Sequence, residues 1–74
     1  MNKQFKKIAT DFLDDRYDIM KSLETGMNNG TYQDKNYSQY YVNKAYYDGA
    51  IRMIEMLGGD WKRNEDGHHK IFGI

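Results

Sequence analysis

Four aspartates lie close together in the first part of the sequence, and their spacing suits one side of a helix. Side chains three or four residues apart are neighbours on a helix surface. Paired carboxylates can serve as general acid and base, and a one-sided negative charge can imitate phosphates or steer a basic partner. Such runs are usually a solvated helix face, which is the interpretation we favour. The four residues are Asp11, Asp14, Asp15 and Asp18.

The two histidines, His68 and His69, are adjacent. Neighbouring residues of a strand point to opposite faces, so this pair would not bind one metal ion. A structural zinc site would need further ligands, notably cysteine, and the sequence contains none. Gly58-Gly59 follows a helical segment rather than leading into one, and it lacks the lysine of a phosphate-binding loop. We therefore expect no enzyme, no metal site and no cofactor, and we expect the histidines to fill strand positions.

Tyrosine is the most informative residue type, because six of the seven tyrosines lie between positions 32 and 47. Adjacent tyrosines lie about 100° apart on a helix, so some of them must be exposed. Exposed tyrosine is enriched at binding hot spots, whereas tyrosine at the edge of a core keeps its hydroxyl in water, and both interpretations stay open. The predicted partner-binding residues are Tyr37, Tyr40, Tyr41, Lys44 and Tyr47, with Asp11, Asp14, Asp15 and Asp18 as steering charges.

The formal net charge is zero, from eleven basic and eleven acidic side chains. Domains that bind nucleic acid usually carry a basic excess, because neutralising phosphates supplies much of their affinity. Nucleic acid is therefore the less favoured partner, although aromatic side chains interleaved with cations can stack bases. The cations that would serve this alternative are Lys3, Lys6, Lys7, Lys62, Arg63 and Lys70.

A chain of 74 residues is close to the lower limit for a self-sufficient core, and without cysteine no disulfide can support it. Association with a second copy is therefore kept open. The basic start is followed by no apolar run that would make a signal peptide, and no segment is apolar for the length of a membrane span. We expect a cytoplasmic protein with no membrane partner.

Apolar residues at spacings of three and four predict two helices, over residues 3–25 and 37–57, joined by a connector over 26–36. Asn2 and Asn36 are the expected N-caps. The expected stops are the cluster Gly26, Asn28, Asn29 and Gly30 after the first helix and the pair Gly58-Gly59 after the second. The expected core positions are Phe5, Ile8, Ala9, Phe12, Leu13, Tyr17, Ile19, Met20, Leu23 and Met27 in the first helix, and Tyr46, Tyr47, Ala50, Met53, Ile54 and Leu57 in the second.

Gly49 lies inside the second predicted helix, where glycine costs about 1 kcal/mol relative to alanine. A close approach of the first helix or of a partner would explain a glycine at this point. The sequence does not decide between these two neighbours.

The tail is predicted to form a β-hairpin over residues 60–72. Two short alternating runs flank Asn64-Glu65-Asp66-Gly67, and a glycine after aspartate supplies the positive φ that such a turn needs. Alternation places His69 and Ile71 on one face. A two-stranded hairpin is marginal alone, so we expect Trp61 with either Ile71 or Phe72 to hold it against the helices.

The tail also resembles the endings of small uncharacterised proteins from phages of Gram-positive bacteria. The resemblance rests on Gly58-Gly59-Asp60-Trp61-Lys62-Arg63 followed by Asp66-Gly67-His68-His69-Lys70-Ile71-Phe72. Some proteins of that kind inhibit host defence, including anti-CRISPR proteins, which often bind a nuclease surface. The resemblance implies such a role for this chain and carries no site residues across.

The sequence thus predicts a single domain over residues 1–74 with a mainly α, small α+β fold, in which a two-helix antiparallel hairpin carries a C-terminal β-hairpin. We expect a non-enzymatic protein-binding module that occludes a host defence or nucleic-acid-processing protein. The alternatives are a small nucleic-acid-binding accessory protein and a self-assembling helical protein that forms a four-helix dimer.

Overall fold

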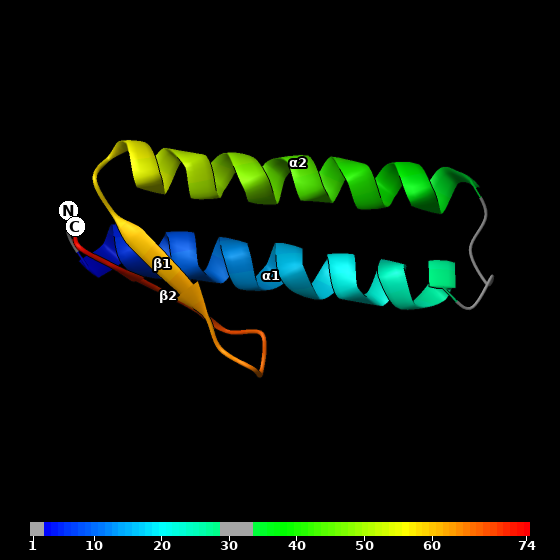
Figure 1. Ribbon diagram of the computed structural model, residues 1–74, viewed down its shortest axis with the longest axis horizontal. Coiled ribbons are helices and arrows are strands. Elements are labelled where there is room, and N and C mark those ends of the chain that lie inside the picture. The colour runs from blue at the N-terminus through cyan, green and yellow to red at the C-terminus, as the bar shows by residue number, and fades with distance from the viewer. Residues whose placement is uncertain (1–2, 29–33) are drawn as a thin grey trace.

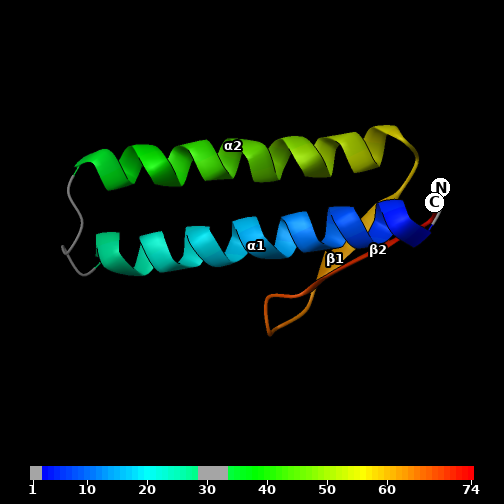
Figure 2. The ribbon, with the colours of Figure 1, turned by 180° about the vertical axis from the view of Figure 1, so that it is seen from behind.

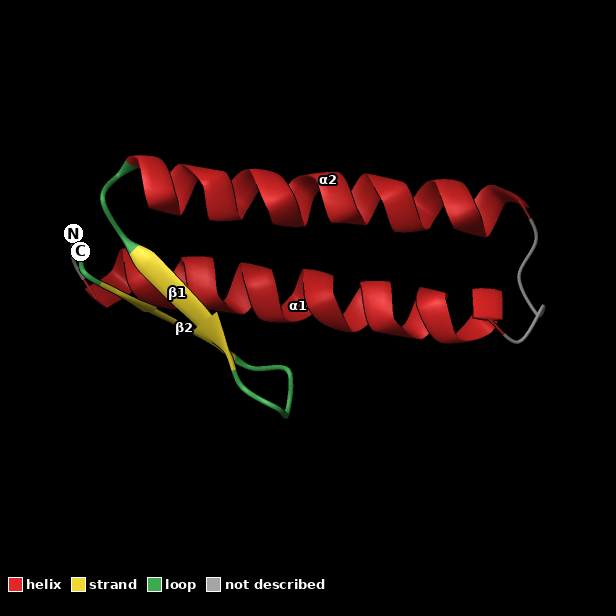
Figure 3. Ribbon diagram, in the orientation of Figure 1, coloured by secondary structure: helices red, strands yellow, loops and turns green. Residues whose placement is uncertain are grey.

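Two antiparallel helices and a β-hairpin make up the computed structural model, which describes residues 3–28 and 34–74, and the side chains of 3–26 and 38–74. Helix α1 (Lys3–Asn28) and helix α2 (Asp34–Met56) lie side by side along the long axis of a 42 × 22 × 16 Å molecule (Figure 1). Strands β1 (Asp60–Arg63) and β2 (His69–Phe72) form an antiparallel pair that crosses one side of α1 (Figure 3). The predicted fold class is confirmed.

The predicted ends of the connector are wrong. Helix α1 continues past Gly26, and α2 begins before Asn36, so this asparagine lies within the helix and does not cap it. Gly26 is buried, and packing at this position offsets the low helix propensity of glycine. Residues 29–33 of the connector, the predicted cap Asn2 and the side chain of Met27 lie outside the described part of the chain.

Helix α2 ends where the sequence predicts, in a Schellman motif. The Gly58 N–H donates to the Glu55 carbonyl over 3.0 Å, and the Gly59 N–H donates to the Ile54 carbonyl over 2.9 Å. Gly58 has a φ of 88°, the left-handed conformation that this motif requires after the last helical turn. The motif turns the chain sharply, so β1 starts beside the end of α2.

The β-hairpin is also confirmed, with a tight turn at its predicted glycine. The Gly67 N–H donates to the Asn64 carbonyl over 3.0 Å, and Gly67 has a φ of 89°. In this register Trp61 pairs with Ile71, and alternate residues of β2 are buried. The buried residues are His69 and Ile71, so the predicted face packs on the helices and Ile71 holds the hairpin there.

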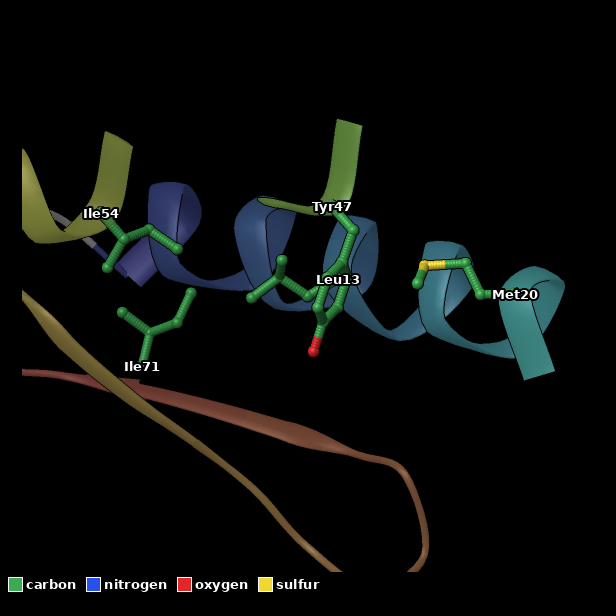
Figure 4. Packing of buried hydrophobic residues seen from close by; sticks show 5 residues of the cluster. All are labelled: Leu13, Met20, Tyr47, Ile54 and Ile71. Atoms are coloured by element: carbon green, nitrogen blue, oxygen red, sulfur yellow. The ribbon is translucent and has the colours of Figure 1, made fainter. Parts of the chain in front are cut away.

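A small apolar core lies between the two helices and the hairpin. In Figure 4 the ring of Tyr47 extends from α2 toward the hairpin, and Ile71 points from β2 toward the helices. The most deeply buried side chains are Leu13 and Ile54. The described residues of this core are Leu13, Met20, Tyr47, Ile54 and Ile71.

The apolar stripes predicted for the two helices are broader than the buried seam between them. Tyr46 and Met53 are exposed although the adjacent Tyr47 and Ile54 are buried. Adjacent residues lie about 100° apart on a helix, so only one member of each pair faces α1. The expected core residues that are instead exposed are Ile8, Ile19, Tyr46, Met53 and Leu57.

Candidate functional site

A polar network joins the hairpin to both helices. His69 of β2 lies with Nδ1 2.8 Å from Asp14 Oδ1 on α1 and with Nε2 2.7 Å from the Tyr47 hydroxyl on α2. Because a carboxylate can only accept, Nδ1 donates to Asp14. In the neutral imidazole with its proton on Nδ1, Nε2 then accepts from the tyrosine hydroxyl. The His69 backbone N–H donates to the same Asp14 oxygen over 2.8 Å, and Arg63 of β1 donates to the Tyr47 hydroxyl over 3.4 Å. All four elements therefore meet in one chain of hydrogen bonds.

The network has the order of a catalytic triad, with a carboxylate, an imidazole and a hydroxyl. His69 and Tyr47 are each only 5% exposed, however. The Trp61 ring stacks on the imidazole with centroids 6.1 Å apart, and the Tyr17 ring approaches edge-on at 5.7 Å. These rings pack on the buried imidazole, and the hydrogen bonds of the network hold the hairpin on the helices. His69 does occupy a position in β2, as expected, and it also makes the hydrogen bonds of this network. The expectation that His68 fills a strand position is wrong, because β2 begins at His69.

The electrostatics of Asp14 follow from its two histidine partners. Partial burial raises the pKa of Asp14, but hydrogen bonds from His69 and His68 outweigh it and hold the pKa below the ordinary value of 3.8. The hydrogen bond to Asp14 raises the pKa of His68 above 6.5. Burial raises the pKa of Tyr47 above 10.0, against the opposing influence of Arg63. At neutral pH the carboxylate is therefore ionised and the tyrosine hydroxyl keeps its proton.

The four predicted steering aspartates do not form one site. Asp14 accepts from the hairpin, with His68 Nδ1 3.1 Å from its second oxygen. Asp11 pairs with Lys7 at 2.9 Å on the helix surface. Asp15 and Asp18 are exposed. The structure thus divides the set into one aspartate that holds the fold and three on the surface of α1.

The predicted tyrosine contacts are divided as well. Tyr47 is buried in the core, so its prediction as a partner contact is wrong. Tyr40 packs against the core, and its ring lies nearly perpendicular to the exposed Tyr41 ring, with the ring centroids 5.3 Å apart. Lys44 is exposed and pairs with Asp48 at 2.8 Å. The side chain of Tyr37 lies outside the described part of the chain.

A second candidate site lies on the side of the helix pair that is turned away from the hairpin, which Figure 2 shows uncovered by any other described element. On α1, Ile8 lies about 180° round the helix from Tyr17, whose ring contacts the hairpin at Gly67. Here the Arg16 guanidinium lies 5.1 Å from the Phe12 ring centre. We call this side the open face; its members are Ile8, Phe12, Ile19, Tyr46, Met53 and Leu57.

The open face contains a groove of about 260 Å³ between the two helices. Ile8 is 61% exposed and Met53 is 59% exposed at its rim. The lining side chains are all apolar, namely Phe5, Ile8, Ala9, Phe12, Ala50, Met53 and Ile54. The sequence carried a signal for this groove, because its two apolar stripes are wider than a pair of helices can bury against each other.

No family model, curated protein or solved structure matches this chain. The site must therefore be interpreted from its own chemistry. Among the described side chains, those of residues 3–26 and 38–74, no three of His, Asp or Glu are grouped so as to hold a metal ion. No helix in this described part is both long and apolar enough to cross a membrane.

Proposed function

We propose that this protein is a non-enzymatic protein-binding module and that it binds through the open face. The apolar groove carries the proposal. The largest contiguous apolar patch on a soluble protein is often a functional surface, and extended patches mark interaction sites. A groove between two helices suits the apolar side of a third helix, which would place side chains of every third or fourth residue in it.

The open face differs from the partner-binding surface that the sequence predicts around the tyrosines of α2. Tyr47 is buried and Lys44 is already paired, so these two side chains offer little to a partner. An inhibitor of a host nuclease, the role implied by the resemblance of the tail, would use the open face to occlude its target in the bacterial cytoplasm. Such binding would be stoichiometric, since burying apolar area requires one partner surface for each open face.

A pair of matched variants tests this proposal. Met53→Lys places a charge at the rim of the groove, whereas Tyr41→Lys makes the same kind of change at an exposed site about 120° away round α2. Each tagged variant is immobilised and exposed to a nuclease-treated bacterial lysate that also contains an untagged copy of the chain, and mass spectrometry identifies what is retained. We expect Met53→Lys to lose proteins that wild type and Tyr41→Lys retain.

Two outcomes would contradict the proposal. One is the same retained set for Met53→Lys and wild type, which would place binding elsewhere on the molecule. The other is retention of nothing specific by wild type, not even the untagged copy. Circular dichroism of both variants confirms that each one is folded.

One observation favours nucleic acid as a second candidate partner. Lys62 and Lys70 lie directly opposite each other on the hairpin, and no ion pair neutralises either one within the described residues. Like charges in this position destabilise a strand pair, and a bound phosphate would relieve the repulsion. Phe72, 41% exposed, completes a depression of about 360 Å³ and could stack a base.

Salt dependence tests this second candidate. Binding of a fluorescent single-stranded oligonucleotide should weaken steeply as the salt concentration rises, because each phosphate contact releases a counterion. Lys62→Glu should lower the affinity, whereas Lys21→Glu on α1, distant from the hairpin, should change it little. Absence of binding at low salt would exclude nucleic acid.

A further inference from the structure

A second apolar stripe runs along the outer side of α2. Its residues are spaced four, three, four and three positions apart, and each is exposed. Spacings that average 3.5 residues keep the stripe within about 80° of arc on a helix. We call this stripe the α2 seam; it consists of Val42, Tyr46, Gly49, Met53 and Met56.

Gly49 lies at the centre of the α2 seam and has no function within the described chain. A Cβ atom added to it would meet nothing within 4 Å, so α1 does not approach it closely. Its φ is not positive, so the helix does not need a glycine here. Glycine weakens a helix interior, and close approach by a surface from outside the chain would compensate for that cost.

The spacing of the α2 seam indicates what that surface is. Apolar residues that repeat every 3.5 positions form the contact line of a coiled coil, whose partner is a helix with a matching line. We propose that the partner is α2 of a second copy, which packs antiparallel on this seam about a two-fold axis that passes between residues 47 and 48. This inference rests on the proposed function, because Tyr46 and Met53 belong to the open face as well.

The antiparallel register makes the α2 seam complementary to itself. In this antiparallel pair, residues that lie equally far from the two-fold axis in sequence, on opposite sides of it, meet across the interface. Tyr46 therefore packs on the partner's Gly49, and Met53 packs on the partner's Val42. The two-fold axis repeats both layers. A large aromatic side chain thus fills the space over a glycine, and every seam residue from Val42 to Met53 gains an apolar neighbour. The interface is isologous and closes as a dimer.

The exposed area of the chain agrees with a missing partner. Its accessible surface is 5345 Å² for a mass of 8.8 kDa. A compact monomer of this mass exposes about 4800 Å², so roughly 500 Å² is in excess. A specific interface buries at least about 500–800 Å² on each partner. The excess is therefore of the size that one helix-to-helix interface would cover.

Sedimentation equilibrium from low micromolar to millimolar concentration tests the dimer. We expect wild type to approach twice the mass of one chain, and Gly49→Gln to raise the dissociation constant at least tenfold because its side chain occupies the space of the partner's Tyr46. Glutamine favours helix more than glycine does, so this variant should fold at least as well. Glu55→Gln, exposed about 120° away from Gly49 on α2, is the matched control and should dimerise like wild type.

Disulfide formation tests the orientation, since the sequence contains no cysteine. Oxidation of a mixture of Tyr46→Cys and Gly49→Cys chains should give mainly the mixed dimer in the antiparallel register. A parallel pair would instead give like-with-like dimers from each variant alone. The mixed product supports the proposed register, and predominance of like-with-like products overturns it.

The failure of this inference can be distinguished from failure of the proposed function. Wild type that sediments as a single chain at every concentration overturns the dimer, as does a dimer that Gly49→Gln leaves unchanged. If wild type is a monomer but retains lysate proteins that Met53→Lys does not retain, the open face binds another protein and the proposed function stands.

Discussion

Asp14 differs from its three neighbouring aspartates because the hairpin places three nitrogen atoms around its carboxylate. It accepts from the backbone N–H and Nδ1 of His69 and interacts with Nδ1 of His68. Asp14→Ala would leave buried donors of His69 without an acceptor, so we expect it to lower the free energy of unfolding by about 1–3 kcal/mol. Asp15→Ala, the exposed control on the same helix, should stay within about 0.5 kcal/mol of wild type in urea denaturation. Equal losses for both would contradict a structural role for Asp14.

The same carboxylate makes stability depend on pH. The folded pKa of Asp14 lies below 3.8, so its contribution is complete above that value and is lost as the pH falls through the folded pKa. The folded pKa of His68 lies above 6.5, so its contribution is complete below 6.5 and is lost as the pH rises through the folded pKa. The difference in unfolding free energy between wild type and Asp14→Asn should therefore be largest between pH 3.8 and 6.5.

Urea denaturation over a pH series measures this difference. His68→Asn should abolish the decrease on the alkaline side and leave the acid side, because Asp14 still accepts from His69. A difference that stays constant from about pH 4 to about pH 8 would contradict the linkage.

Among the elements, two glycines fix the hairpin through their backbone conformation. A Cβ atom at Gly58 would meet nothing within 4 Å, so Gly58→Ala should cost only the left-handed backbone, about 1–2 kcal/mol. Gly67→Ala should cost more, because its Cβ would also lie 3.3 Å from the Tyr17 ring. Gly49→Ala, with open space and no positive φ, should instead stabilise the protein in dilute solution by about 0.5–1 kcal/mol. Urea denaturation of the three variants measures these changes in unfolding free energy. An unchanged unfolding free energy for Gly58→Ala would contradict the expected order.

The elements themselves were predictable where local chemistry determines them. The alternating tail and its Asp66-Gly67 turn specified the hairpin, and Gly58 specified the end of α2. The start of α2 was not predictable from residue type alone, because Asn36 is a good capping residue and yet lies inside a helix that begins at Asp34. Local propensity also could not show that packing carries α1 beyond Gly26.

The candidate site was only partly predictable, because it depends on how the elements dock. Asp14 and His69 are 55 residues apart, and nothing in the spacing of either one indicates the other. The excess of apolar residues on both helices did indicate an uncovered surface. The pattern alone could not show which residues stay exposed, since Tyr46 and Tyr47 are identical in type and differ only in the direction that α2 gives them.

At the scale of the whole molecule, the hairpin covers one side of the helix pair and leaves the other bare. The described core consists of a few large side chains, Leu13 and Ile54 among them, so its hydrophobic contribution is modest for a chain of 74 residues. A second copy on the α2 seam would bury Met53 and Tyr46 and extend this core. Folding and association are then coupled, and the stability of the protein depends on its own concentration.

This coupling predicts a melting temperature that rises with protein concentration. A tenfold increase adds about 1.4 kcal/mol to the free energy of a dimer, or about 0.7 kcal/mol for each chain. For a domain of this size that corresponds to a Tm increase of about 3–6 °C, measurable by calorimetry or circular dichroism. The Tm of Gly49→Gln should begin to rise only at a concentration at least about tenfold higher than for wild type. In dilute solution this variant should melt above wild type because its helix is stronger. A wild-type Tm that does not change with concentration would contradict dimerisation through the α2 seam. The partner of the open face would then be a different protein.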